Sequence, residues 1–163
     1  MAMILFMAAM NDIRSKRIPN WLTYPGMVLG LGYHTSMNGM EGLLFGLGGF
    51  FVGILLVIVF FLAGGMGAGD VKLLGVVGAF LGAAGVFTAF LCTALIGGVY
   101  ALAIMIFNGR FKEYMLRYLL MLKTVFVTHK FIYIPPKDSE ALPTLCYGAV
   151  IALGASVAVV GFL

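Results

Sequence analysis

Residues 42–63 read GLLFGLGGFFVGILLVIVFFLA and carry no charge. A helix rises about 1.5 Å per residue, so a stretch of this length crosses the roughly 30 Å hydrocarbon core of a bilayer. Glycines recur in it at G-x-x-x-G spacing, the pattern that lets transmembrane helices approach closely: Gly42, Gly46, Gly49 and Gly53. The stretch predicts a membrane-spanning helix and decides the fold class.

The composition of the whole chain agrees with that prediction. Of its 163 residues 63% are hydrophobic and only 10% are charged, against about 25% charged in a soluble domain. An ordinary soluble domain, a disordered tail and a nucleic-acid binder are therefore excluded. Cys92 and Cys146 lie far apart without a C-x-x-C motif, so neither a disulfide framework nor a zinc site is indicated. We expect an all-α, polytopic integral membrane protein that resides in a lipid bilayer.

Apolar stretches along the chain predict about six transmembrane helices in a single domain. The first is apolar but too short to cross a bilayer, and no basic n-region or A-x-A site marks it as a signal peptide. We interpret it as a short or trimmed first helix. The predicted spans are residues 1–11, 21–36, 42–63, 70–84, 85–107 and 142–163.

The positions of the charges predict an orientation. With six spans, all ten basic residues fall on one face, which the positive-inside tendency makes cytoplasmic. The opposite turn, Met37–Glu41, holds an acid and no basic residue. Residues 110–131 are too charged to span, and their polar positions share one helix face. We expect an amphipathic helix in the cytoplasmic headgroup region; a basic face that docks substrate is the alternative.

Two of the six acids lack a simple explanation. Four are readily interpreted as solvated surface charges: Glu41, Glu113, Asp138 and Glu140. Asp12 and Asp70 instead lie where a hydrophobic span meets the cytoplasmic face. Acids at such positions are costly, which makes each a candidate functional residue. Two positions distant in the sequence thus reach the same depth.

Asp70 ends a glycine-rich stretch, residues 64–70. Its structural alternative is a helix N-cap that accepts from the amides of residues 71–73, which contributes about 1 kcal/mol. A cap does not require both Gly67 and Gly69. Those glycines leave the backbone bare beside the carboxylate, where an extended substrate could approach. The glycines do not form a phosphate-binding loop, because the residues that such a loop requires are not present in this stretch.

Asp12 precedes a basic segment that ends in Ile18-Pro19-Asn20, which predicts a sharp turn before the next span. The structural alternatives for Asp12 are an ion pair with Arg14 or Arg17 and a cap for a short helical turn. If Asp12 lies beside Asp70, however, the two carboxylates can act together as an acid–base pair.

Two carboxylates in a partly dehydrated site cannot both ionise cheaply, so they share a proton. The ionised member can take a proton from water while the protonated member polarises a carbonyl. This is the acid–base requirement of peptide hydrolysis without a covalent intermediate. His34 and His129 have no metal-ligand partner at a recognisable spacing, and no nucleophile motif surrounds the serines or cysteines. We expect no metal or cofactor.

These residues resemble the type IV prepilin peptidases, membrane aspartic proteases of the GxGD class. Gly67-Ala68-Gly69-Asp70 with Val71-Lys72-Leu73-Leu74 resembles the second motif of that family, and Asp12 with Ile18-Pro19-Asn20 the first. Residues 142–143 and 147–154 are similar to its last helix, with three residues between them where the family is often tighter.

The resemblance implies that Asp12 and Asp70 are catalytic and that Gly67 and Gly69 line the approach of the substrate. It further implies that the substrate is the short, basic leader of a type IV pilin-like precursor. The leader would be cut at the cytoplasmic face of the inner membrane. No cytoplasmic domain with paired C-x-x-C motifs is present in the sequence, so methyltransferase activity is not expected. The chain is similar to the short, peptidase-only branch that serves tight-adherence (Flp-type) pili.

Other functions stay open at this point. Archaellin-processing peptidases form another short branch, whereas signal-peptide peptidases and presenilin place the first aspartate in a Tyr-Asp context that Asn11-Asp12 does not match. From other classes, a small transporter or channel could use the two aspartates as proton or ion ligands, and a scaffold subunit would not use them at all. A transporter ordinarily binds near the bilayer midplane and shows repeat symmetry, neither of which the sequence suggests.

Overall fold

The computed structural model describes residues 1–62, 65–107 and 146–162. Within these ranges the chain forms helices and no strands, which confirms the all-α prediction. The described residues form four helices in chain order: α1 (Ala2–Ser15), α2 (Asn20–Leu62), α3 (Ala68–Phe107) and α5 (Tyr147–Phe162). One compact unit is formed by Met1–Gly97 with Cys146–Leu163, and Gly98–Leu145 belong to a second. The predicted amphipathic segment 110–131 lies outside the described residues.

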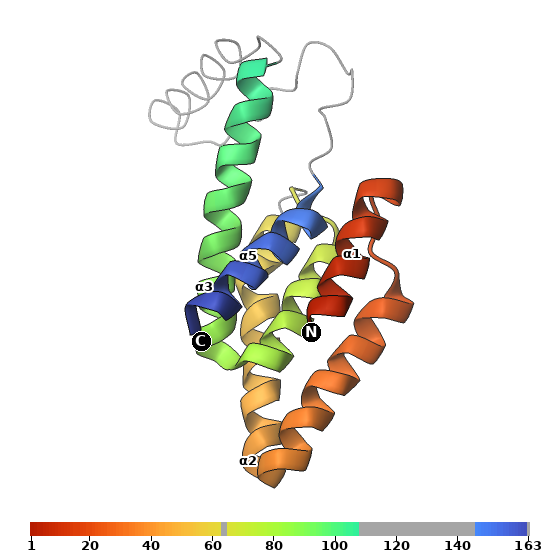
Figure 1. The fold of residues 1–163 in the computed structure, drawn as a ribbon, viewed down its shortest axis with the longest axis vertical. Coiled ribbons are helices and arrows are strands. Elements are labelled where there is room, and N and C mark those ends of the chain that lie inside the picture. Colours follow the sequence, from red (N-terminus) through yellow and green to blue (C-terminus); the bar gives the residue numbers. More distant parts are fainter. Residues whose placement is uncertain (63–64, 108–145, 163) are drawn as a thin grey trace, which may run out of the picture. The chain divides into compact units, whose positions relative to one another are not determined.

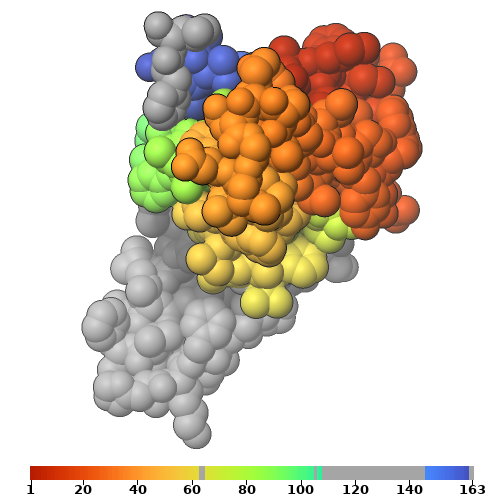
Figure 2. Space-filling model, turned by 90° about the horizontal axis from the view of Figure 1, so that it is seen from below, coloured from red at the N-terminus to blue at the C-terminus, as the bar shows by residue number. Residues whose placement is uncertain are grey.

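Helix α2 is a hairpin of two helical segments rather than one rod. Its 43 residues would extend about 65 Å as a straight helix, twice the hydrocarbon thickness of a bilayer. The helix is broken at Gly39 (φ 58°, ψ −131°), and the segment after the break returns along the one before it. Gly42 packs on the backbone of His34, and Gly46 packs on Leu31. Figure 1 shows the hairpin, and Figure 2 shows its turn (orange) uncovered at the surface.

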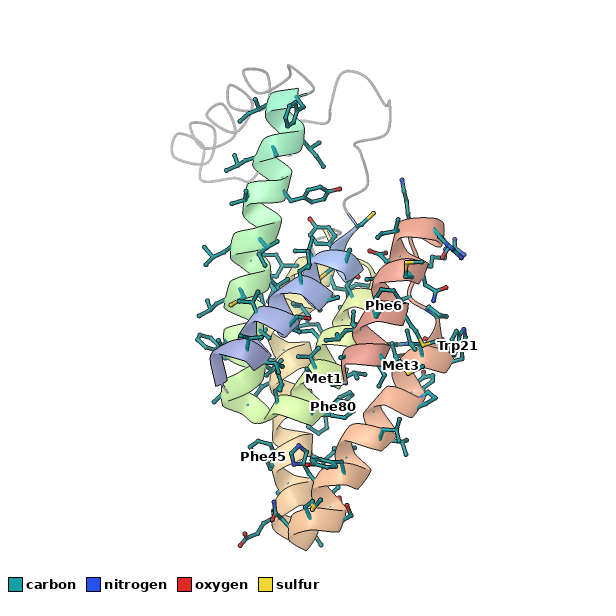
Figure 3. The ribbon with its side chains drawn as sticks, in the orientation of Figure 1. Met1, Met3, Phe6, Trp21, Phe45 and Phe80 are labelled. Carbon is teal, nitrogen blue, oxygen red and sulfur yellow. The ribbon has the colours of Figure 1, made fainter. Side chains whose placement is uncertain are left out.

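Helix α3 has a similar break at Gly82 (φ 70°, ψ −177°). The ring of Phe45, from the second half of α2, lies where a side chain at position 82 would be. His34 stacks beside Phe45 with ring centroids 4.9 Å apart, and its Nε2 lies 2.8 Å from the Phe80 carbonyl oxygen. Phe80 lies just before the break, where the regular backbone hydrogen bonds of the helix are interrupted, and His34 supplies a partner for its carbonyl oxygen. Figure 3 labels Phe45 and Phe80 at this end of the bundle.

The first half of α3 is the central helix of the unit. From Asp70 to Ala79 every residue except Lys72 is buried. The second half of α2 packs against it at glycines, where backbones meet directly: Gly49 contacts Gly78, and Gly53 contacts Leu74. Such close crossings are the expected use of G-x-x-x-G spacing. They run antiparallel, so the start of α3 and the turn at Gly39 lie at opposite ends of the unit.

Helices α1 and α5 complete the unit and lie side by side (Figure 1). Leu5, Ala8 and Asp12 follow the helical repeat and form the buried face of α1. Along α5, Gly154 packs on Thr93 in the second half of α3. The last helix therefore bridges α1 and α3.

The outer surface of the unit is strongly apolar. Met3 is 75% exposed, Phe6 67% and Trp21 60%, and Figure 3 labels all three. Soluble proteins rarely expose contiguous apolar surface of this kind. Among the described residues two helices, Asn20–Leu62 and the Ala68–Ile104 part of α3, are long and apolar enough to cross a membrane. With the breaks at Gly39 and Gly82, the described residues hold six helical segments close to the predicted spans, and the six-span topology stays a prediction.

The glycines at the two helix breaks, Gly39 and Gly82, allow a matched test of the packing around Phe45. We expect Gly82→Ala to lower the free energy of unfolding by about 1–3 kcal/mol more than Gly39→Ala does. Both glycines have positive φ, so alanine strains the backbone at each. Only at Gly82 does the added methyl group also meet the Phe45 ring, whereas nothing lies within 4 Å of it at Gly39. Unfolding in detergent micelles measures the difference, and equal losses would contradict the packing described for Phe45.

Candidate active site

Asp12 lies in the last turn of α1 on the face that packs into the unit. It is 6% exposed, because its helical position repeats those of Leu5 and Ala8. The helix ends just beyond it: Lys16 adopts the left-handed conformation (φ 51°), and its N–H donates to the Asp12 carbonyl oxygen at 2.8 Å. The backbone of Asp12 is thereby fixed at the end of α1.

The carboxylate of Asp12 is held from the last helix. The backbone N–H of Gly148 donates to Asp12 Oδ2 at 2.8 Å, and this hydrogen bond is buried. Arg14 and Arg17 are exposed, so the partner of Asp12 in this structure is an amide rather than a guanidinium. The ion-pair alternative considered from the sequence is not what the structure contains.

Asp70 is 8% exposed and is the third residue of α3. Its Oδ2 accepts from the backbone N–H of Gly67 at 3.2 Å. The N-cap alternative considered for Asp70, with the amides of residues 71–73 as donors, is not what the structure contains, because the helix begins at Ala68 and Gly67 is the N-cap. A side chain at the third helical position reaches back to the N-cap amide instead, as in one half of a capping box.

The structure brings the two carboxylates together. They lie close enough for the charge of Asp12 to act on Asp70, and the charge of Asp70 acts in turn on the phenol of Tyr147. Each carboxylate accepts from a glycine N–H, one before α3 and one at the start of α5. The two buried aspartates of α1 and α3, with the half-buried Tyr147 at the start of α5, thus form one polar group in an apolar unit.

The two predicted glycines differ in what they contact. A Cβ on Gly67 would lie 3.2 Å from Asp70 Oδ2, so the loop lies directly beside the carboxylate. A Cβ on Gly69 would lie 3.0 Å from the Cβ of Ile18 and 3.3 Å from its backbone nitrogen. The α1–α2 connection therefore packs on the start of α3. At Gly69 the missing side chain already serves a contact within the chain.

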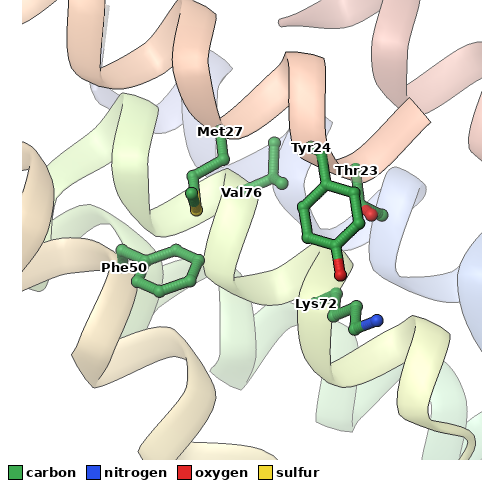
Figure 4. Close-up of a pocket in the computed structure, with 6 residues that line it drawn as sticks. All are labelled: Thr23, Tyr24, Met27, Phe50, Lys72 and Val76. Carbon is green, nitrogen blue, oxygen red and sulfur yellow. The ribbon is translucent and has the colours of Figure 1, made fainter. Parts of the chain in front are cut away.

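Lys72 lies two residues after Asp70, but its side chain contacts Asn20 and Tyr24. Its Nζ donates to Asn20 Oδ1 at 2.9 Å and lies 5.3 Å from the centroid of the Tyr24 ring. Figure 4 shows the hollow beside these residues, which is also lined by Thr23, Met27, Phe50 and Val76. The volume of this hollow is about 30 Å³.

Sequence reasoning assigned no site role to Gly148. In the sequence it is one of several glycines in an apolar stretch, as are Gly154 and Gly161. Nothing local distinguishes a glycine that donates to a distant carboxylate from one that packs on a helix. The one available signal was the resemblance of residues 147–154 to the last helix of the prepilin peptidases, which did not by itself assign a role.

A family model described as the type IV leader peptidase family matches residues 1–102, more than half of the chain. The chain belongs to the type IV leader peptidase family. This confirms the resemblance found in the sequence and makes the chain a peptidase of a membrane-associated family with prepilin-like substrates. Comparisons with curated proteins and with solved structures gave no match. The matched residues of this leader peptidase include Asp12 and Asp70, whereas α5 lies outside them.

Proposed function

We propose that this leader peptidase is an aspartic endopeptidase whose acid–base pair is Asp12 and Asp70. The observation that carries the proposal is that the two carboxylates are buried within reach of each other's charge in an otherwise apolar unit. The substrate is the basic leader of a type IV pilin-like precursor.

Fold stability does not account for this pair. Two like charges brought together with little solvent raise each other's electrostatic energy. Asp12 also lies in the last turn of α1, where the helix dipole disfavours negative charge. Asp70 could stabilise the start of α3 through its bond to Gly67, but a solvent-exposed acid would do the same. Two buried carboxylates side by side are instead typical of an active site, where the proton that they share takes part in the reaction.

The proposed reaction needs one proton on the pair. The ionised carboxylate takes a proton from water, whose oxygen then bonds to the scissile carbonyl carbon, while the protonated carboxyl gives its proton to the carbonyl oxygen. Collapse of the tetrahedral intermediate breaks the C–N bond. The departing nitrogen receives a proton from the protonated carboxyl, while one hydroxyl group of the intermediate returns its proton to the ionised carboxylate, so the pair again holds one proton. No covalent enzyme intermediate forms.

The backbone around Gly67 is proposed to meet the substrate. An extended leader presents backbone amides and carbonyls, and a loop without side chains beside Asp70 allows close approach. Gly69 is proposed to assist by letting Ile18 pack closely, which keeps that approach uncovered. Recognition then rests on backbone and apolar contacts, because the basic residues near the site would not attract a basic leader.

The membrane placement is proposed as well. Six spans in the inner membrane, with Asp12 and Asp70 at the cytoplasmic face, agree with the six helical segments and with the exposed apolar side chains. The exposed Arg14, Lys16 and Arg17 just beyond Asp12 fit a cytoplasmic position.

Co-expression with a tagged prepilin-like precursor tests the proposal. The wild-type chain should convert the precursor to a product smaller by the length of the leader, and the double variant Asp12→Asn/Asp70→Asn should leave it uncut. Glu41→Gln is the matched control, because Glu41 is an exposed acid away from the site and its variant should cleave normally. Cleavage by the double variant would refute the assignment, and aspartate-dependent ion flux in proteoliposomes without cleavage would favour a transporter.

A further inference from the structure

We propose that Gly148, at the start of α5, is a positioning residue for the aspartate pair. It acts through its backbone N–H, which holds the carboxylate of Asp12 in the orientation that faces Asp70. The inference rests on the proposed function and extends it to a helix that the family match does not cover.

The geometry at Gly148 is specific to Asp12. The donor–acceptor distance of 2.8 Å lies at the short end of the range for N–H···O hydrogen bonds, and both residues are buried. A Cβ at position 148 would lie 2.9 Å from the Cβ of Asp12, 3.0 Å from its Cγ and 3.0 Å from its Oδ2. All three nearest atoms belong to the same aspartate side chain. Glycine at this position therefore serves Asp12 and not general helix packing.

Other glycines of α5 have different surroundings. Gly154 packs on the backbone of Thr93, which is a helix–helix contact, and nothing lies within 4 Å of a Cβ placed on Gly161. Gly148 is also the second residue of the helix, where a backbone N–H has no partner within the helix. Its donor is thus available to Asp12, and the bond fixes a side chain that would otherwise sample several rotamers.

The kinetic test compares Gly148→Ala with Gly161→Ala on a prepilin-like substrate. We expect Gly148→Ala to lower kcat by about 100-fold, since displacing a catalytic group by about 1 Å costs a factor of that order. KM should stay within about threefold, because substrate contacts are not changed. Gly161→Ala should behave as the wild type. An unchanged kcat, or a loss confined to KM, would overturn the proposal.

A double-mutant cycle on thermal unfolding keeps the test informative when Gly148→Ala folds poorly. The added methyl group collides with the side chain of Asp12, so its destabilising effect should shrink in an Asp12→Ala background. Gly161→Ala should have the same effect in both backgrounds. Additive effects for Gly148→Ala and Asp12→Ala would show that the contact is absent and would refute the positioning role.

The two proposals fail in different ways. Cleavage that survives in the Asp12→Asn/Asp70→Asn variant refutes the proposed function and the positioning role with it. Loss of cleavage in that variant together with wild-type kcat in Gly148→Ala leaves the acid–base pair standing and refutes only the role of Gly148.

Discussion

Replacing Asp70 by asparagine should lower the rate of leader cleavage by about 1,000-fold or more, within the range that general acid–base groups contribute. Asparagine has nearly the same shape but cannot exchange a carboxyl proton. Its side-chain oxygen can still accept from the Gly67 N–H, which Asp70 Oδ2 accepts at 3.2 Å. The start of α3 should therefore persist while the chemistry is lost.

Purified Asp70→Asn should accordingly unfold at nearly the wild-type temperature in micelles while single-turnover cleavage is lost. Glu41→Gln again serves as the control acid. A residual rate within tenfold of the wild type would contradict the role of Asp70. Loss of folded protein in parallel with activity would instead point to a structural role for its hydrogen bond.

The second large effect concerns stability. Gly49→Ala should lower the free energy of unfolding by about 3 kcal/mol or more, at the upper end for overpacked cores. A methyl group there would collide with the carbonyl oxygen of Gly78 and would lie 2.7 Å from the Cα of Gly82. These are backbone atoms of the central helix, so no side chain can rotate away to make room. The collision can be avoided only if α2 moves away from α3.

The neighbouring residue supplies the control for this variant. Gly48 lies in the same helical segment, and nothing lies within 4 Å of a Cβ placed on it. Gly48→Ala should leave stability within about 1 kcal/mol of the wild type, on the stabilising side, because alanine favours helix. Denaturant titration of both variants in micelles measures the contrast. Similar effects at positions 48 and 49 would contradict the direct backbone contact.

The helical segments were predictable from the sequence because uncharged stretches of bilayer length have few alternative structures. The turn between the second and third spans was placed in Met37–Glu41, and the structure locates the break at Gly39 within it. In a chain with 23 glycines, composition alone cannot say which one adopts positive φ. Phe45 beside Gly82 is a tertiary contact that no local pattern encodes.

The candidate site was predictable in part for a related reason. Asp12 and Asp70 stood out because an acid in an apolar chain needs a compensating use. Their partners did not stand out, since backbone amides are present at every residue except proline. The donor to Asp70 lies before it rather than after it, because α3 begins two residues earlier than expected. The role of Gly148 depends on how α1 and α5 pack, which the sequence does not state locally.

The hydrogen bond from Gly148 to Asp12 joins residues 136 positions apart, and this separation has a consequence for biosynthesis. In the proposed six-span arrangement, Asp12 enters the membrane with the first helix, whereas its donor arrives only with the last. A ribosome that has completed every segment through α3 has produced both aspartates but not the helix that orients one of them. The peptidase should therefore acquire activity only after α5 has inserted, so that newly made chains are inert throughout their assembly in the membrane.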